Sequence, residues 1–191
     1  MRVLVTDAGL RAGLSAIWSL GRAGVKVIAA SEDINAPGLQ SKYAWKQFVY
    51  VSPKENVKGF QDGLLRYVMG EKPDVVLPVT DLTILPILKI RQELEKHTKL
   101  AVPEGRILKK SPDKLESLDI AKRGGLAVPK TFFPRNISEA YRAAEGIRYP
   151  VALKPRFSKE IADNKVVPHD VRYAMNRGEL SGKYMIVGEV R

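Results

Sequence analysis

The sequence contains no cysteine, and this absence limits the chemistry open to the protein. None of its 191 residues is Cys and only two are His, so disulfides, thiolate zinc sites and iron–sulfur clusters are excluded. His97 and His169 lie far apart, and neither shows the spacing of a metal ligand. Any chemistry must therefore come from oxygen and nitrogen groups.

Long hydrophobic runs are also missing, and no apolar stretch has the length needed to cross a bilayer. The opening residues 1–7 read MRVLVTD, which predicts a buried strand and not a secretory leader. We therefore expect a cytoplasmic protein that does not associate with membranes. With 45% apolar residues the chain can bury enough surface for one full domain and a smaller appendage.

The charge of the chain is strongly positive but dispersed. A formal net charge of +11 favours anionic partners. Lysines and arginines alternate with acidic residues, however, and no basic run carries interleaved aromatic residues, which single-stranded nucleic acid would favour. The sequence therefore favours nucleotide phosphates over nucleic acid as the anionic partner.

The first hundred residues repeat one unit, a short apolar run followed by a helical pattern. This repeat is typical of a mostly parallel sheet with helices on its faces. Strands are expected at residues 3–6, 25–30, 48–51, 75–79 and 100–102. Helices are expected at residues 14–22, 57–70 and 83–96, and Pro86 would be tolerated only in the first turn of the last. The pattern predicts an open α/β domain over residues 1–103.

The pattern changes after residue 103. Ser111, Pro112 and Asp113 supply an N-cap, a proline at the first helical position and an acid in the first turn. The helix they start should end at glycines 124 and 125, and residues 104–125 are the expected connector between domains. Residues 126–191 are expected to form a small antiparallel lobe. Its elements are strands near Val128 and at residues 151–153, 166–167 and 184–187, with a helix at 138–145.

Polar residues follow two of the expected strands at their carboxyl ends, where open α/β sheets bind ligands. Asp7 follows the first strand, and Thr80 and Asp81 follow the fourth. The turn at residues 7–13 fits a tight, closely packed strand-to-helix connection or an anion contact, and Asp81 fits a helix cap equally well. We take Asp7, Thr80 and Asp81 as candidate substrate-binding residues.

Lys154 is the candidate whose position the sequence defines best. It ends the apolar run at residues 151–153 and precedes Pro155, so a strand would hold its ammonium group at a defined position. A fixed ammonium can bridge phosphate oxygens and neutralise charge during phosphoryl transfer. The alternative is a lysine at the end of a strand that reaches solvent.

In their order along the chain, these segments resemble the ATP-grasp superfamily, specifically its carboxylate ligase and carbamoyl-phosphate-synthase-like branch. The similar segments are VLVTDAG, GLSAIWSLGRAGVKVIAA, SKYAWKQFVYV, DVVLPVTDLTILP, SPDKLESLDIAKRGGLAVPKTF and YPVALKPRFS. Each is weakly specific alone, and their common order carries the resemblance. It implies a Rossmann-like pre-ATP-grasp domain followed by the small ATP-grasp lobe, with the large catalytic lobe missing.

The resemblance also implies ATP as cofactor and a small carboxylate substrate that is activated as an acyl phosphate. Lys114 matches a nucleotide-contacting position in the connecting helix, and Lys154 matches the lysine on the ATP phosphates. The strand at residues 184–187 resembles the one that reaches the adenine hinge, where Glu189 would be the acidic residue.

Two departures from the family pattern limit what the resemblance implies. The loop that is glycine-rich in many relatives contains no glycine at residues 156–160, so Arg156, Ser158 or Lys159 would supply phosphate contacts instead. The family's magnesium ligands lie beyond Arg191. We therefore expect no ligation by this polypeptide alone, and magnesium only together with the missing lobe.

Three functions remain open at this point. The first is an incomplete ligase, as a fragment, as a subunit whose partner chain supplies the large lobe, or as a homo-oligomer. The second is a non-catalytic interaction protein that keeps the fold. The third is a dinucleotide-binding protein, in which an acid of residues 31–33 would bind the ribose. The third is disfavoured because the turn at residues 7–13 lacks the Gly-x-Gly-x-x-Gly fingerprint.

Overall fold

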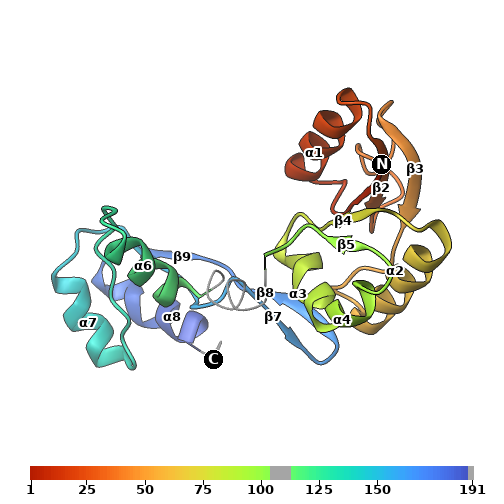
Figure 1. Cartoon of the computed structure of the whole chain (residues 1–191). Coiled ribbons are helices and arrows are strands. Elements are labelled where there is room, and N and C mark those ends of the chain that lie inside the picture. The colour runs from red at the N-terminus through yellow and green to blue at the C-terminus, as the bar shows by residue number, and fades with distance from the viewer. Residues whose placement is uncertain (104–112, 189–191) are drawn as a thin grey trace. The chain divides into compact units, whose positions relative to one another are not determined.

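The chain forms two compact units in the computed structural model, which describes residues 1–103 and 113–188 (Figure 1). Unit 1 contains residues 1–103 together with residues 159–167. Unit 2 contains the described residues of 104–158 and 168–191. The expected division into residues 1–103, 104–125 and 126–191 remains a proposal, and the structure adds a later segment to the first unit.

Unit 1 is built on a parallel sheet of five strands in the order β3-β2-β1-β4-β5. The strands are β1 Arg2–Val5, β2 Lys26–Ser31, β3 Ala44–Val49, β4 Val75–Leu77 and β5 Lys99–Leu100. β1 lies at the centre, with Leu4 paired to Ile28 on one side and to Val76 on the other. The expected parallel α/β architecture is therefore confirmed.

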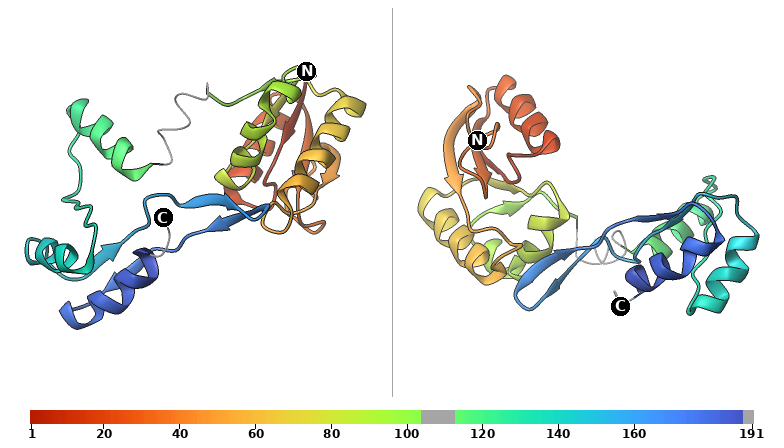
Figure 2. Two further views of the ribbon diagram at one scale, coloured as in Figure 1. Left: turned by 90° about the horizontal axis from the view of Figure 1, so that it is seen from below. Right: turned by 180° about the vertical axis from the view of Figure 1, so that it is seen from behind.

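Successive side chains of each strand point to opposite faces of the sheet, and each face is covered by its own helices. On one face Leu4 and Ile28 pack with Phe60 of α2 (Val57–Glu71), and α3 (Asp81–Lys89) and α4 (Arg91–Leu94) belong to the same cluster. On the other face Val3 and Val27 pack with Ile17 of α1 (Arg11–Arg22). Figure 2 shows this layering from two further directions.

The helix expected at residues 83–96 is two helices, α3 and α4, which meet at Ile90. Pro86 lies in the second turn of α3, so the expectation that it requires the first turn is wrong. The proline removes one hydrogen bond to the preceding turn. α3 is only nine residues long, and the Pro86 carbonyl accepts a hydrogen bond of 2.8 Å from Gln61.

The third strand begins four residues earlier than expected, at Ala44. It is an edge strand, and its residues alternate between half-buried and exposed. An alternating edge strand lacks the continuous apolar run of a strand buried on both faces, which is why the apolar pattern alone placed it too late.

Unit 2 contains an antiparallel pair of strands with two helices packed beside it. β6 (Val151–Leu153) pairs with β9 (Arg172–Ala174), with Ala152 opposite Tyr173. Ala144 of α7 (Ile137–Glu145) packs with Ala174 and with Leu180 of α8 (Arg177–Gly188). A further helix, α6 (Lys114–Arg123), follows Asp113.

Two strands expected in unit 2 are not strands. The residues around Val128 have no regular structure, and residues 184–187 belong to α8. α8 is started by reciprocal capping: the Asn176 side chain accepts from the Glu179 amide at 3.1 Å, and the Glu179 carboxylate accepts from the Met175 amide at 3.2 Å. Lys183 adds an ion pair with Glu179 one turn further on.

A hairpin of two short strands, β7 (Lys159–Ala162) and β8 (Lys165–Pro168), packs against helices of unit 1. Its two-residue turn has positive φ at both positions, 45° at Asp163 and 60° at Asn164, as a tight hairpin turn requires. The figures draw this hairpin beside α3. Ile161 and Val166 pack there with Val57 and Leu82.

The tip of this hairpin caps the N-terminus of α2. The Asn164 carbonyl accepts from the Val57 amide at 2.7 Å, and its side-chain oxygen accepts from the Lys58 amide at 2.9 Å. Asn56, the N-cap of α2, accepts from the Gly59 amide and from the side-chain amide of Asn164. The first three amides of the helix, which lack partners within it, are thus all satisfied.

We predict that Asn164→Gly keeps the turn but weakens the docking of the hairpin. Glycine tolerates the positive φ, but it removes the acceptor of the Lys58 amide, and loss of such a cap costs about 1 kcal/mol. Hydrogen exchange at Lys58 should become faster and the free energy of unfolding should fall. Asp163→Gly, in the same turn, is the matched control and should leave exchange at Lys58 unchanged. An equally slow exchange in Asn164→Gly would contradict this account.

Candidate functional site

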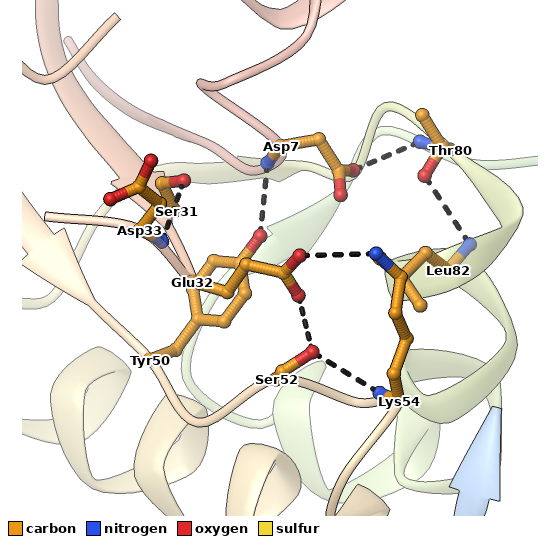
Figure 3. A network of polar contacts seen from close by, with 9 residues as sticks. All are labelled: Asp7, Ser31, Glu32, Asp33, Tyr50, Ser52, Lys54, Thr80 and Leu82. Atoms are coloured by element: carbon orange, nitrogen blue, oxygen red, sulfur yellow. Dashed lines mark hydrogen bonds and ion pairs between the residues drawn. The ribbon is translucent and has the colours of Figure 1, made fainter. Parts of the chain in front are cut away.

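The carboxyl end of the sheet carries a network of polar groups around Asp7 (Figure 3). Asp7 is buried, and one carboxylate oxygen, Oδ2, accepts from the Thr80 amide at 3.0 Å and from the Thr83 hydroxyl at 2.7 Å. Thr6 and the amide of Val79 also donate to this oxygen, at 2.9 and 3.3 Å. The carboxylate therefore joins the end of β1 to the turn between β4 and α3.

The structure brings the three candidate substrate-binding residues together in this network. Asp7 lies at its centre, Thr80 is the N-cap of α3 and accepts from the Leu82 amide, and Asp81 is in the first turn. Asp7 has a φ of 56°, and a side chain at Gly13 would lie 2.3 Å from the Asp7 carbonyl oxygen. The turn at residues 7–13 is thus a closely packed connection between strand and helix.

Tyr50 lies beneath Asp7 at the end of β3 and is buried. Its hydroxyl accepts from the Asp7 amide at 3.2 Å. Burial, followed by the negative charge of Asp7, raises the pKa of the Tyr50 phenol well above its ordinary value. The phenol is therefore a neutral member of the network.

The acidic residues after β2 form local contacts at the same edge. Ser52 donates to one oxygen of the Glu32 carboxylate, and Lys54 lies 3.3 Å from the other. Asp33 accepts from the Asn35 amide at 2.9 Å, in the turn that follows. Figure 3 shows the Glu32 carboxylate between Ser52 and Lys54, near the ring of Tyr50.

A second cluster lies in unit 2 at the N-terminus of α6. Asp113 is the N-cap of this helix and accepts from the amides of Leu115 and Glu116. The same carboxylate receives two parallel bonds from Arg156, at 3.0 Å from Nε and 2.6 Å from Nη2. The Arg156 guanidinium holds the pKa of the Asp113 carboxyl below its usual range.

Three of the five cofactor-binding candidates meet at this cluster. The Lys114 ammonium donates to the Ser158 hydroxyl at 2.9 Å, and the Lys114 amide donates to the Arg156 carbonyl at 3.2 Å. Lys154 follows β6 directly and is exposed, two residues before Arg156 on the same segment. Glu189 lies outside the described residues, and its expected strand is replaced by α8 up to Gly188.

Three important members of these clusters are not among the sequence candidates. Thr83 and Tyr50 reach Asp7 from other elements, and nothing in their local sequence indicates this. Asp113 was expected in the first turn of the helix, whereas it is the N-cap itself. An aspartate directly before a helical pattern is a known N-cap signal, so its position was open to prediction.

The described residues hold no group of three or more His, Asp or Glu that could bind a metal ion. None of the helices described is long and apolar enough to cross a membrane.

No family model matches the chain. Its relatives and its neighbours in fold are nevertheless enzymes of the ATP-grasp superfamily. The fold and the sequence similarity together show that this chain is related to a part of these enzymes.

Two curated relatives illustrate the relationship. A formate-dependent phosphoribosylglycinamide formyltransferase from Ignicoccus hospitalis is 27% identical over 150 residues, which are 76% of this chain and 34% of the relative. The carbamoyl phosphate synthase large chain of Pseudothermotoga lettingae is 26% identical over 147 residues, or 76% of this chain and 12% of the relative. The chain thus spans 34% of the length of the first enzyme and 12% of the length of the second.

A solved structure shows the same fold. It is the biotin carboxylase domain dimer of the 2-oxoglutarate carboxylase of Hydrogenobacter thermophilus, in complex with MgADP, ADP and bicarbonate. The likeness has a TM-score of 0.63 at 18% identity, and it covers 96% of this chain and 39% of the other.

We predict that Asp7→Ala destabilises unit 1 much more than Thr83→Val. The alanine leaves the amide of Thr80 without its acceptor, at a cost of about 1–3 kcal/mol for a buried unsatisfied group, whereas the Val79 amide keeps the Thr6 hydroxyl as a second acceptor. Valine has nearly the same shape as threonine, so Thr83→Val removes only one hydroxyl from the same network. Urea unfolding of the two variants measures the difference, and equal losses would show that Asp7 does not hold the turn.

We predict that Tyr50 makes unit 1 sensitive to alkali. The folded state raises the pKa of its phenol, so the stability it contributes is complete below the unfolded pKa of about 10 and is lost as pH rises above that value. Tyr67 acts in the same direction, because burial and, to a smaller extent, the charge of Glu71 raise the pKa of its phenol to about 12.

The free energy of unfolding should therefore fall more steeply above pH ~10 in the wild type than in Tyr50→Phe. The difference in slope should approach about 1.4 kcal/mol per pH unit. Tyr173→Phe serves as the control, because this side chain is 56% exposed. Parallel curves for wild type and Tyr50→Phe would refute the prediction.

Proposed function

We propose that this chain is the substrate-side domain and part of the ATP site of an ATP-dependent ligase that activates a small carboxylate as an acyl phosphate. One observation carries the proposal. Lys114 is far from Arg156 and Ser158 in the sequence, yet the three residues converge at the N-terminus of α6 beside the segment of Lys154. Fixed cations at a helix N-terminus are suited to phosphate groups.

Each residue of this cluster has a definite part in the proposal. The Lys154 ammonium is exposed and contacts the phosphates. Arg156 uses Nε and Nη2 on Asp113, which fixes the guanidinium, and it keeps the N–H groups of Nη1 for a phosphate oxygen. Lys114 and Ser158 position one another and supply a further ammonium and hydroxyl. Glu189 is proposed beside the adenine.

The substrate carboxylate is proposed to bind at the carboxyl end of the sheet in unit 1. There the Asp81 amide at the start of α3 and the Thr80 hydroxyl are proposed as donors to an anion. Asp7 holds this turn in place, and Asp81 is proposed to contact cationic parts of the substrate. Magnesium is proposed to bind only together with the large lobe.

We predict that the chain binds ATP weakly and that Lys154→Ala lowers the affinity about tenfold or more, as loss of a charge-assisted bond to phosphate should. Calorimetric titration with ATP and with AMP measures this, and the loss should be large for ATP and small for AMP. Lys165→Ala removes an exposed lysine of β8 and is the control. If both variants bound ATP as tightly as the wild type, Lys154 would not be a phosphate contact.

Catalysis is proposed to require a large ATP-grasp lobe from a second chain. Purified chain should show no ATPase activity alone. Co-purification with the products of adjacent reading frames, followed by an assay for carboxylate-dependent phosphate release, tests the proposal. Release by the chain alone would contradict it.

A further inference from the structure

A hollow of about 590 Å³ lies in unit 1, outside both clusters described above. It opens between α1 and residues 37–43, the segment that leads into β3 (Figure 1). None of its lining residues is a candidate for substrate or ATP binding. Its volume is within the range of roughly 300–1,000 Å³ that small-molecule sites have. The hollow is therefore large enough to be a separate ligand site.

One wall of the hollow is a stripe of side chains on α1. Leu14, Trp18 and Arg22 follow one another at intervals of one turn, so they lie on the same side of the helix. The Trp18 side chain is 47% exposed, although its neighbour Ile17 is fully buried in the core of unit 1. This wall thus presents a large uncovered indole with a guanidinium one turn away.

The other wall is held in place by close contacts with the rest of unit 1. Leu39 is buried in the core. The Gly38 amide donates to the Ala8 carbonyl at 3.0 Å, and a side chain at Gly38 would lie 2.5 Å from that oxygen. Tyr43 packs over Gly21 of α1, where a side chain would lie 2.4 Å from the Tyr43 β-carbon. The hollow is therefore preformed, which lowers the entropic cost of binding a ligand.

Each wall of the hollow carries a cation. Arg22 lines it from α1, and Lys42, whose ammonium lies 5.2 Å from the Tyr43 ring centre, lines it from the other side. Neither cation has an ion-pair partner within the described parts of the chain. Residues 11–22 and 34–43, which include both walls, contain no Asp or Glu. The positive charge of the hollow therefore favours an anionic ligand.

We propose that this hollow binds a small planar anion, that is, an aromatic ring system with a carboxylate or a phosphate. The ring packs against Trp18 and Tyr43, and the anionic group accepts charge-assisted hydrogen bonds from Arg22 and Lys42. A neutral ring leaves both cations without a partner, and an anion without a ring leaves the indole exposed. Both parts of the ligand therefore contribute to its affinity.

The indole N–H signals in a two-dimensional ¹⁵N NMR spectrum report on this site directly. The chain has two tryptophans, of which Trp18 lines the hollow and Trp45 does not. Titration with 2-naphthoate should shift the Trp18 signal and leave that of Trp45 in place, and Trp45→Phe assigns the two signals.

Further probes separate the parts of the ligand. The neutral 2-naphthamide and the non-aromatic cyclohexanecarboxylate should each bind about tenfold more weakly than 2-naphthoate, because each lacks one of the two contacts. Uridine monophosphate, titrated in the same way, distinguishes the two sources of a planar anion. Tighter binding of this probe identifies a nucleotide, and tighter binding of 2-naphthoate identifies an aromatic carboxylate.

Two double variants of equal net charge separate the hollow from general attraction to a basic protein. Arg22→Gln with Lys42→Gln should weaken 2-naphthoate binding about tenfold or more and leave that of 2-naphthamide unchanged. The control, Lys89→Gln with Lys99→Gln, removes two exposed lysines of unit 1 that do not line the hollow, and it should bind like the wild type. Calorimetry of Trp18→Ala should show weaker binding of both probes, because both stack on the indole.

Several results would overturn the proposal. These are a Trp18 signal that does not move at millimolar probe, equal shifts of both indole signals, equal losses in the two double variants, or equal affinities for 2-naphthoate and 2-naphthamide. Light scattering adds one more, because a dimer that is lost in Trp18→Ala would show that a second copy of the chain covers the hollow instead. Circular dichroism spectra of all variants confirm that the comparison is between folded proteins.

Discussion

One buried carboxylate, that of Asp7, holds the carboxyl end of the sheet together. It accepts hydrogen bonds from the end of β1 and from the turn that begins α3, and its own amide donates to Tyr50 at the end of β3. The central strand β1, the edge strand β3 and the start of α3 are thus connected through one residue. A carboxylate only accepts hydrogen bonds, so donors from several segments of the chain can converge on it. Any ligand group bound at this edge meets a turn that is already fixed.

The parallel sheet was predictable because its signal is local. Strands such as β1 and β2 are apolar throughout, and the helices between them repeat with helical spacing. The sequence predicts β3 too late because an edge strand alternates, and it predicts a strand at residues 184–187, the end of α8, because these residues are rich in β-branched and aromatic types. The capping pair Asn176 and Glu179 indicates a helix, and this start signal outweighs the propensity of the residues that follow.

The candidate site was predictable to the extent that single segments determine it. Asp7, Thr80 and Lys154 stand at strand ends, and strand ends can be read from a sequence. The contacts of Tyr50 and Thr83 with Asp7, and the contact of Arg156 with Asp113, join residues that are distant along the chain. Such contacts depend on the assembled fold, and one sequence contains no signal for them.

The hairpin of β7 and β8 has a consequence for how the chain is connected. It packs in unit 1, whereas the segments before and after it belong to unit 2. The polypeptide therefore passes between the two units three times instead of once. Residues 1–103 by themselves contain only part of the cap of α2, because the acceptors of its first two amides come from Asn164, some hundred positions later. When only the first hundred residues have been synthesised, all five strands of the sheet are present, but Asn164, which completes the cap of α2, is not.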